Sequence, residues 1–146
     1  MPPELTATLD SLAVQAGPGE FTAVENLLGG TFLPIAEIRR NAVAEINATS
    51  LTFQEVRDWL SGLPVGGHAE LRVAWIAERI GARMSFGAFA AHIDDLWFPA
   101  VDDIVALLHA DGDLMVLVLD HEELITLSIL NPGEVAALGA FGSSRS

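Results

Sequence analysis

Three short apolar segments near the C-terminus place the strongest constraint on how this chain folds. Leu, Val and Ile dominate Ile104–His109, Leu114–Leu119 and Leu124–Leu130. Asp111-Gly112 separates the first two segments, and this dipeptide favours the two-residue turn of a β-hairpin. The polar stretch Asp120–Glu123 joins the second segment to the third. The pattern predicts three antiparallel strands in a meander.

The central segment adds a requirement of its own. Leu114–Leu119 reads LMVLVL and is apolar at every position, whereas a strand with one wet face alternates apolar and polar residues. A strand of this kind needs cover on both faces. Helices of the same chain supply one side, and the other side requires a further helix or a second copy of the chain. A homodimer through the sheet is therefore an open alternative.

The first two thirds of the chain are predicted to be helical. Thr52 and Glu55 form a capping box at the start of one helix. His68–Ile80 is read as the clearest helix, with Leu71, Ala74, Trp75 and Ile76 as its apolar face and Gly81 as its stop. Arg39 and Arg40 lie beside the apolar stripe of another segment and are expected to face water. Helical spacing is seen in Leu5–Val14, Phe21–Leu28, Ile35–Ile46, Thr52–Leu60, His68–Ile80 and Phe86–Trp97.

The predicted fold class is α+β, with a helical N-terminal two thirds packed on a small three-stranded antiparallel β-meander near the C-terminus. A chain of 146 residues is expected to form one domain over residues 1–146. Residues 1–98 are expected to be mainly helical and 103–130 to hold the antiparallel strands. Asn131–Glu134 opens a final short helix, and Gly142–Ser146 is expected to be a loose tail.

Composition narrows the location and the chemistry. The chain has no cysteine, which excludes disulfides, thiolate catalysis and Cys-ligated zinc. Its first residues lack a basic segment followed by an apolar run, so we expect no signal peptide and a cytoplasmic location. Apolar stretches stay near ten residues, well below the roughly 20 that a membrane span needs.

Charge is distributed unevenly along the chain. Residues 1–83 hold ten acids and six Arg, whereas residues 84–146 hold ten acids and one Arg. Nine of these last ten acids lie within Asp94–Glu123. The formal net charge of −13 repels nucleic acid and anionic lipid, so neither is expected as a partner. It favours a basic protein partner or a divalent cation.

Two aromatic residues are flanked by pairs of acids. Trp97 and Phe98 stand between Asp94-Asp95 and Asp102-Asp103 at the predicted end of a helix, where a fully buried side chain is awkward. An exposed tryptophan rimmed by acids is typical of a binding hot spot. The predicted partner-binding residues are therefore Asp94, Asp95, Trp97, Phe98, Asp102 and Asp103, with Asp120, Glu122 and Glu123 as a second patch.

A metal-assisted enzyme is the alternative from a different class. His92, His109 and His121, with Asp95 and Asp103, offer imidazole and carboxylate ligands suited to zinc, manganese or iron. No nucleophile elbow or local Ser/His pair indicates nucleophilic catalysis. We assign no catalytic residue, no metal ligand and no cofactor, and the enzyme question stays open.

The segment Ile93–Asp103, IDDLWFPAVDD, resembles a phrase found in small bacterial immunity proteins of polymorphic toxin systems, including those of the SUKH type. The likeness covers about 40 residues, from Phe86 to Leu127, as a helix, an aromatic-proline loop and short strands. It implies a cytoplasmic, non-catalytic protein that neutralises one toxin domain. Together, charge and resemblance predict an acidic protein-binding domain, with the metal enzyme and a structural homodimer as alternatives.

Overall fold

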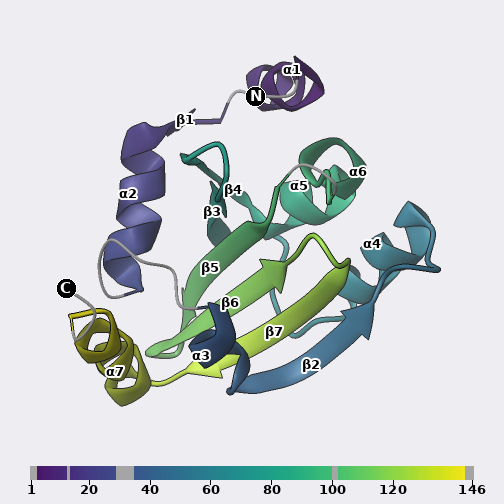
Figure 1. The fold of residues 1–146 in the computed structure, drawn as a ribbon. Helices are drawn as coiled ribbons and strands as arrows, with labels where there is room; N and C mark the ends of the chain where they lie inside the picture. Colours follow the sequence, from purple (N-terminus) through teal and green to yellow (C-terminus); the bar gives the residue numbers. More distant parts are fainter. Residues whose placement is uncertain (1–2, 13, 29–34, 100–101, 144–146) are drawn as a thin grey trace.

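One seven-stranded antiparallel sheet forms the centre of the molecule (Figure 1). The computed structural model describes residues 3–12, 14–28, 35–99 and 102–143. The strand order is β1-β4-β3-β5-β6-β7-β2, and every neighbouring pair is antiparallel. The strands are β1 (Ala16–Gly17), β2 (Ala42–Asn47), β3 (Glu70–Trp75), β4 (Ile80–Ser85), β5 (Ile104–Ala110), β6 (Asp113–Leu119) and β7 (Leu124–Leu130).

Helices cover both faces of this sheet. The described helices are α1 (Pro3–Ser11), α2 (Pro18–Leu27), α3 (Ile35–Arg39), α4 (Phe53–Ser61), α5 (Phe86–Ala91), α6 (Ile93–Leu96) and α7 (Pro132–Ser143). Figure 1 shows α3 in front of the sheet and α5 and α6 behind it. None of the described helices is long and apolar enough to cross a membrane.

The predicted fold class is wrong in its division of the chain. Four of the strands lie before residue 98, in the part of the chain that the sequence predicts to be mainly helical. The largest error is the helix predicted over His68–Ile80, which is instead the hairpin of β3 and β4. In β3, Leu71, Val73 and Trp75 enter the core and Arg72 is only half-buried, so the true period is two. The helix predicted over Ile35–Ile46 likewise divides into α3 and β2.

The three strands predicted near the C-terminus are present as β5, β6 and β7, with the Asp111-Gly112 turn between the first two. Asp111 has φ 52° and Gly112 has φ 86°, the left-handed pair of a type I′ turn. These strands are not a separate meander, because β3 continues the sheet from β5 and β2 continues it from β7.

Strand β6 explains why the core has two layers. Met115, Leu117 and Leu119 enter one apolar cluster, which also contains side chains of α1, α4, α5 and α6. Leu114, Val116 and Val118 enter a second cluster with side chains of α2 and α3, and Val135 of α7 packs against it. The cover needed on both faces therefore comes from this chain, and the apolar strand gives no reason for a dimer through the sheet.

Local capping signals are reliable in this sequence. The capping box predicted at the start of α4 is present: Thr52 Oγ1 accepts from the Glu55 N–H at 3.2 Å, and Glu55 Oε1 accepts from the Thr52 N–H at 3.1 Å. Helix α7 runs to Ser143, so the first two residues of the predicted tail are helical, and Ser144–Ser146 lie outside the described residues.

Candidate protein-binding surface

The sheet brings three connections together at one of its ends. Trp75 is paired with Ile104, Ile104 with Leu119, and Leu119 with Ile125. The β3–β4 turn, the segment before β5 and the β6–β7 turn therefore lie beside one another. We call Asp120–Glu123 and the neighbouring Asp103 the acidic turn. Five of the nine predicted partner-binding residues lie at this end of the sheet: Asp102, Asp103, Asp120, Glu122 and Glu123.

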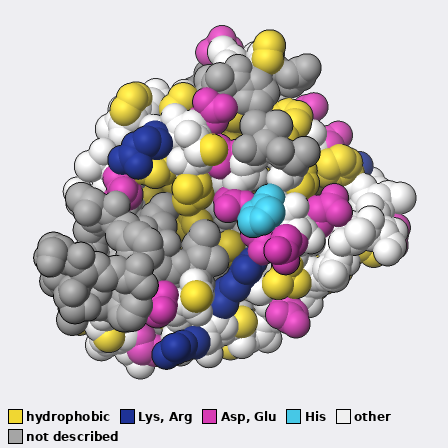
Figure 2. Space-filling view, viewed as in Figure 1, with side chains coloured by type: hydrophobic (Ala, Val, Ile, Leu, Met, Phe, Trp, Pro, Cys, Tyr) yellow, Lys and Arg dark blue, Asp and Glu magenta, His cyan; other side chains and the backbone are white. Residues whose placement is uncertain are grey.

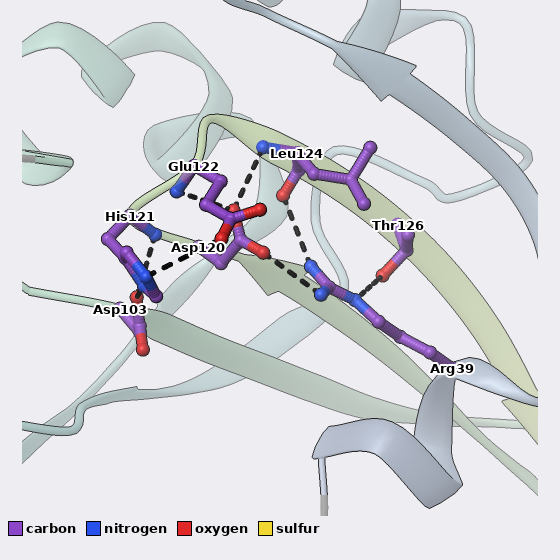
Figure 3. Close-up of polar contacts among 7 residues, drawn as sticks. All are labelled: Arg39, Asp103, Asp120, His121, Glu122, Leu124 and Thr126. Atoms are coloured by element: carbon purple, nitrogen blue, oxygen red, sulfur yellow. Dashed lines mark hydrogen bonds and ion pairs between the residues drawn. The ribbon is translucent and has the colours of Figure 1, made fainter.

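Asp120 holds the β6–β7 turn from inside (Figure 3). Its residue is 8% exposed, and its Oδ1 accepts from the Glu122 N–H at 2.9 Å and from the Leu124 N–H at 3.0 Å. A carboxylate that accepts backbone N–H groups in this way replaces water around the turn and fixes its shape.

Arg39 of α3 closes the same turn from the neighbouring helix (Figure 3). Its Nη1 lies 2.9 Å from Asp120 Oδ2, its Nε donates to Thr126 Oγ1 at 3.3 Å, and its Nη2 donates to the Leu124 carbonyl at 3.4 Å. Burial alone raises the pKa of Asp120. The backbone N–H of Leu124, the Arg39 guanidinium and the N–H of Glu122 outweigh that effect and hold the pKa below its usual range.

Arg39 was expected to face water, and that expectation is wrong. Its side chain is 23% exposed and binds groups more than eighty residues away in sequence. In the sequence, Arg39 is simply an arginine beside an apolar helical stripe. Arginines that face water have the same position, so the sequence does not distinguish Arg39 from them.

His121 is fixed by Asp103 from the segment before β5. Asp103 Oδ1 accepts from the His121 N–H at 2.7 Å and lies 3.0 Å from His121 Nδ1. The hydrogen bond and the charge of Asp103 raise the pKa of His121. The side chain of His121 is 66% exposed and that of Glu122 is 79% exposed, with Nε2 and Oε1 4.0 Å apart. Figure 2 shows a histidine side chain on this face of the molecule with acidic side chains beside it.

Glu123 occupies a strained position in the same turn. Its φ of 65° lies in the left-handed region that glycine and asparagine tolerate best. Its carbonyl accepts from the Ala48 N–H at 2.8 Å, which ties the turn to the end of β2. Glu123 therefore places a carboxylate at a backbone conformation that favours a residue without a bulky side chain.

Asp102 has a structural place rather than a surface one. Its carboxylate accepts from the Ala77 N–H at 2.6 Å and the Glu78 N–H at 3.1 Å, and the residue is 7% exposed. Burial raises its pKa, and the hydrogen bonds only partly oppose this. Asp102 therefore shapes the β3–β4 turn and is not available to a partner in this conformation.

The first predicted patch is divided by the structure. Asp94 and Asp95 of α6 are exposed, and Asp94 Oδ1 lies 3.3 Å from Arg57 Nη1 of α4. Trp97 is 2% exposed and belongs to the first core, and Phe98 packs against that core. The expectation of an exposed tryptophan is wrong, because the chain turns inward after α6. Trp97 Nε1 is buried and has no hydrogen-bond partner among the described residues.

The histidines of the metal alternative do not converge. His109 lies at one end of the β5–β6 hairpin, paired with Leu114, and His121 follows the other end of β6. Seven strand residues separate these ends by about 20 Å. Within the described ranges, no three His, Asp or Glu side chains are grouped closely enough to hold a metal ion.

Most arginines are already paired within the described chain. Ion pairs join Arg39 to Asp120, Arg57 to Asp94, Arg72 to Glu20, Arg79 to Glu25, and Arg83 to Glu20 and Glu70. Asp95, Asp103, Glu122 and Glu123 have no arginine partner among the described residues. Three of them, Asp103, Glu122 and Glu123, lie in the acidic turn, where the His121 ring lies beside Asp103 and Glu122.

Comparisons of the chain with protein-family models, with curated proteins and with solved structures find no match. The resemblance of Ile93–Asp103 to immunity proteins therefore stays a prediction.

Proposed function

We infer that this chain is a non-catalytic acidic binding protein, and that its acidic turn engages a basic protein partner. One observation carries this proposal: exposed side chains stand on a turn whose backbone is held in place. Glu122 and His121 project from the surface on a turn that Asp103, Asp120 and Arg39 hold by hydrogen bonds and ion pairs.

Long-range charge supports the choice of a basic partner. A chain with a net charge of −13 attracts cationic surfaces before contact and repels anionic ones. Complementary charge raises association rates from about 10⁵–10⁶ M⁻¹s⁻¹ toward 10⁸ M⁻¹s⁻¹ or more at low salt. The arginine-free carboxylates of the acidic turn are the natural contacts for lysine and arginine side chains of the partner.

Preorganisation supports the acidic turn as the contact site. Ordering a loop during association costs free energy that is subtracted from the affinity. The β6–β7 turn is fixed before any partner arrives, because its backbone N–H groups already bind Asp103 and Asp120. A partner therefore meets carboxylates that project from a turn whose backbone is already ordered.

A toxin domain is one form that such a partner takes. The likeness of Ile93–Asp103 to immunity proteins supports this form, and a basic nuclease domain is the toxin whose charge fits best. The metal-enzyme alternative receives no support from the described residues, since its histidines are dispersed.

Affinity capture tests the proposal. The tagged protein is incubated with lysate of its source and washed at rising salt, beside a Glu122→Lys variant. Glu70→Lys is the matched control, because Glu70 is 63% exposed and lies at the opposite end of β3 from the acidic turn. We expect one basic protein that leaves with salt, is lost from Glu122→Lys and is kept by Glu70→Lys. Equal capture by all three proteins would contradict the proposal.

A further inference from the structure

Strand β2 forms an open edge of the sheet next to the acidic turn. The strand order ends at β2, and no described strand pairs with its outer side. Figure 1 shows β2 along the lower margin of the sheet, with β7 on one side and no ribbon beyond the other. An exposed strand edge carries unpaired N–H and C=O groups, and these can pair with a further strand.

The register identifies which backbone groups point outward. Ala48 N–H donates to the Glu123 carbonyl, and Ile46 is paired with Ile125 two residues earlier in the same ladder. In an antiparallel ladder, bonded residues alternate with residues whose groups face the other side. Ala44 and Ile46 therefore bind β7, and the N–H and C=O groups of Glu45 and Asn47 point away from the sheet.

Side chains of β2 give this edge two distinct faces. Ala44 and Ile46 pack against the first core, whereas Glu45 is exposed. The register shifts between Ala42 and Ala44, so Val43 is a bulged residue without a partner on β7, and it is 61% exposed. The bulge confines regular pairing to Ala44–Asn47, which is enough for a short segment in one register.

The negative charge around the β2 edge favours a basic segment as the strand that pairs with it. Glu45 lies on the edge itself, and the Ala48–Glu123 hydrogen bond places the acidic turn at the end of the strand. A second copy of the chain would bring another net charge of −13 to the same edge. A basic strand meets favourable cross-strand pairing with Glu45 and apolar contact beside Ala44 and Ile46.

We propose that a short extended segment of the basic partner adds to β2 as an eighth strand, with basic residues on the Glu45 face and apolar residues on the Ala44 and Ile46 face. This inference rests on the proposed function and names the conformation of the partner. Backbone pairing supplies the register, and the acidic turn supplies charge at one end of the added strand.

A synthetic peptide of alternating lysine and valine, seven residues long, tests the proposal. Its control has the same sequence with alternate backbone nitrogens methylated, which keeps the charge and side chains and removes strand pairing. Affinities are measured by NMR titration of the full chain, with assignment of the Glu45 and Asn47 amides. We expect the parent peptide to shift these two amides and slow their hydrogen exchange, and to bind at least tenfold more tightly than the methylated peptide.

Two variants separate backbone pairing from charge. Glu45→Pro removes the outward N–H without touching a hydrogen bond to β7, and Glu45→Gln removes only the charge. We expect the proline variant to lose at least tenfold in peptide affinity and the glutamine variant about two- to threefold.

Three outcomes would overturn the added strand. Equal binding of parent and methylated peptides would mean that charge alone acts, and would leave the acidic binding function standing. Absence of binding at β2 by the parent peptide would reject the edge as a docking site, whatever the capture experiment gives. A dimer in sedimentation that Glu45→Pro dissociates would make a second copy the occupant.

Discussion

Removal of the Asp120 carboxylate should loosen the acidic turn and destabilise the whole chain. In Asp120→Ala, the N–H groups of Glu122 and Leu124 have no acceptor, and Arg39 has no ion pair at this turn. All of these interactions lie at a partly or fully buried position, with the Asp120 side chain 11% exposed and that of Arg39 23% exposed.

The magnitude follows from the hydrogen bonds and the ion pair that the substitution removes. Each hydrogen bond to a charged acceptor contributes about 1.5 kcal/mol, which gives about 3 kcal/mol for the two N–H groups. The partly buried ion pair between Arg39 and Asp120 adds about 1 kcal/mol. We expect Asp120→Ala to lower the free energy of unfolding by about 4 kcal/mol, a fall in Tm of about 8–16 °C. Asp120→Asn keeps the acceptor oxygen and should be destabilised by about half as much.

The pH dependence has a definite sign. The pKa of Asp120 is lowered in the folded state, so its contribution to stability is fully present above the unfolded value near 3.8. The contribution is lost as pH falls through the lowered pKa. The difference between the wild-type chain and Asp120→Asn should therefore shrink below pH about 4.

Urea unfolding followed by tryptophan fluorescence measures these differences, with Glu122→Ala as a control. Glu122 has a 79% exposed side chain, so the control should change the unfolding free energy by less than about 0.5 kcal/mol. A decrease below about 1 kcal/mol in Asp120→Ala would refute the argument that these interactions hold the turn.

Three further predictions concern separate parts of the fold. Asp103→Asn should lower the pKa of His121 toward 6.5, because it removes the carboxylate whose hydrogen bond and charge raise that pKa; an unchanged pKa in an NMR titration would contradict this. The His121–Asp103 pair stabilises most below pH 6.5, and its effect fades as pH rises through the raised pKa. Glu123→Gly should be about 1 kcal/mol more stable than Glu123→Ala in urea unfolding, because of the φ of 65°; the reverse order would dismiss the strain argument. Gly81→Ala should lower the free energy of unfolding by at least about 2 kcal/mol, because its Cβ would lie 2.7 Å from the Glu20 carbonyl oxygen. Calorimetry measures this loss beside Gly66→Ala, where space is open; a smaller loss would mean that α2 shifts to make room.

Local sequence signals predicted the strands at β5, β6 and β7 and the capping box of α4. Each of these depends on residues a few positions apart, and the Asp111-Gly112 turn fixes one register by itself. The hairpin of β3 and β4 was missed because its turn, Ile76–Arg79, contains no Gly, Pro or Asn to mark it. Arg79 takes the left-handed conformation there, with φ 54°, at a residue type that gives no such signal.

Interactions between distant segments account for the remaining errors at the candidate site. Arg39 meets Thr126 across 87 positions, and Asp102 meets Ala77 across 25. Neither pair is visible from spacing, because the strand order that joins them is a property of the whole sheet. The acidic residues on both sides of Trp97 favour an exposed side chain, whereas the structure buries Trp97 in the core.

The most direct test of the central claim is the association rate constant with the captured partner, measured by stopped-flow fluorescence from low to high ionic strength. We predict a rate that falls steeply with salt in the wild-type chain and in Glu70→Lys. Glu122→Lys should associate several-fold more slowly at low salt and depend less on salt. Equal rates for the two variants at every salt concentration would contradict a basic partner at the acidic turn.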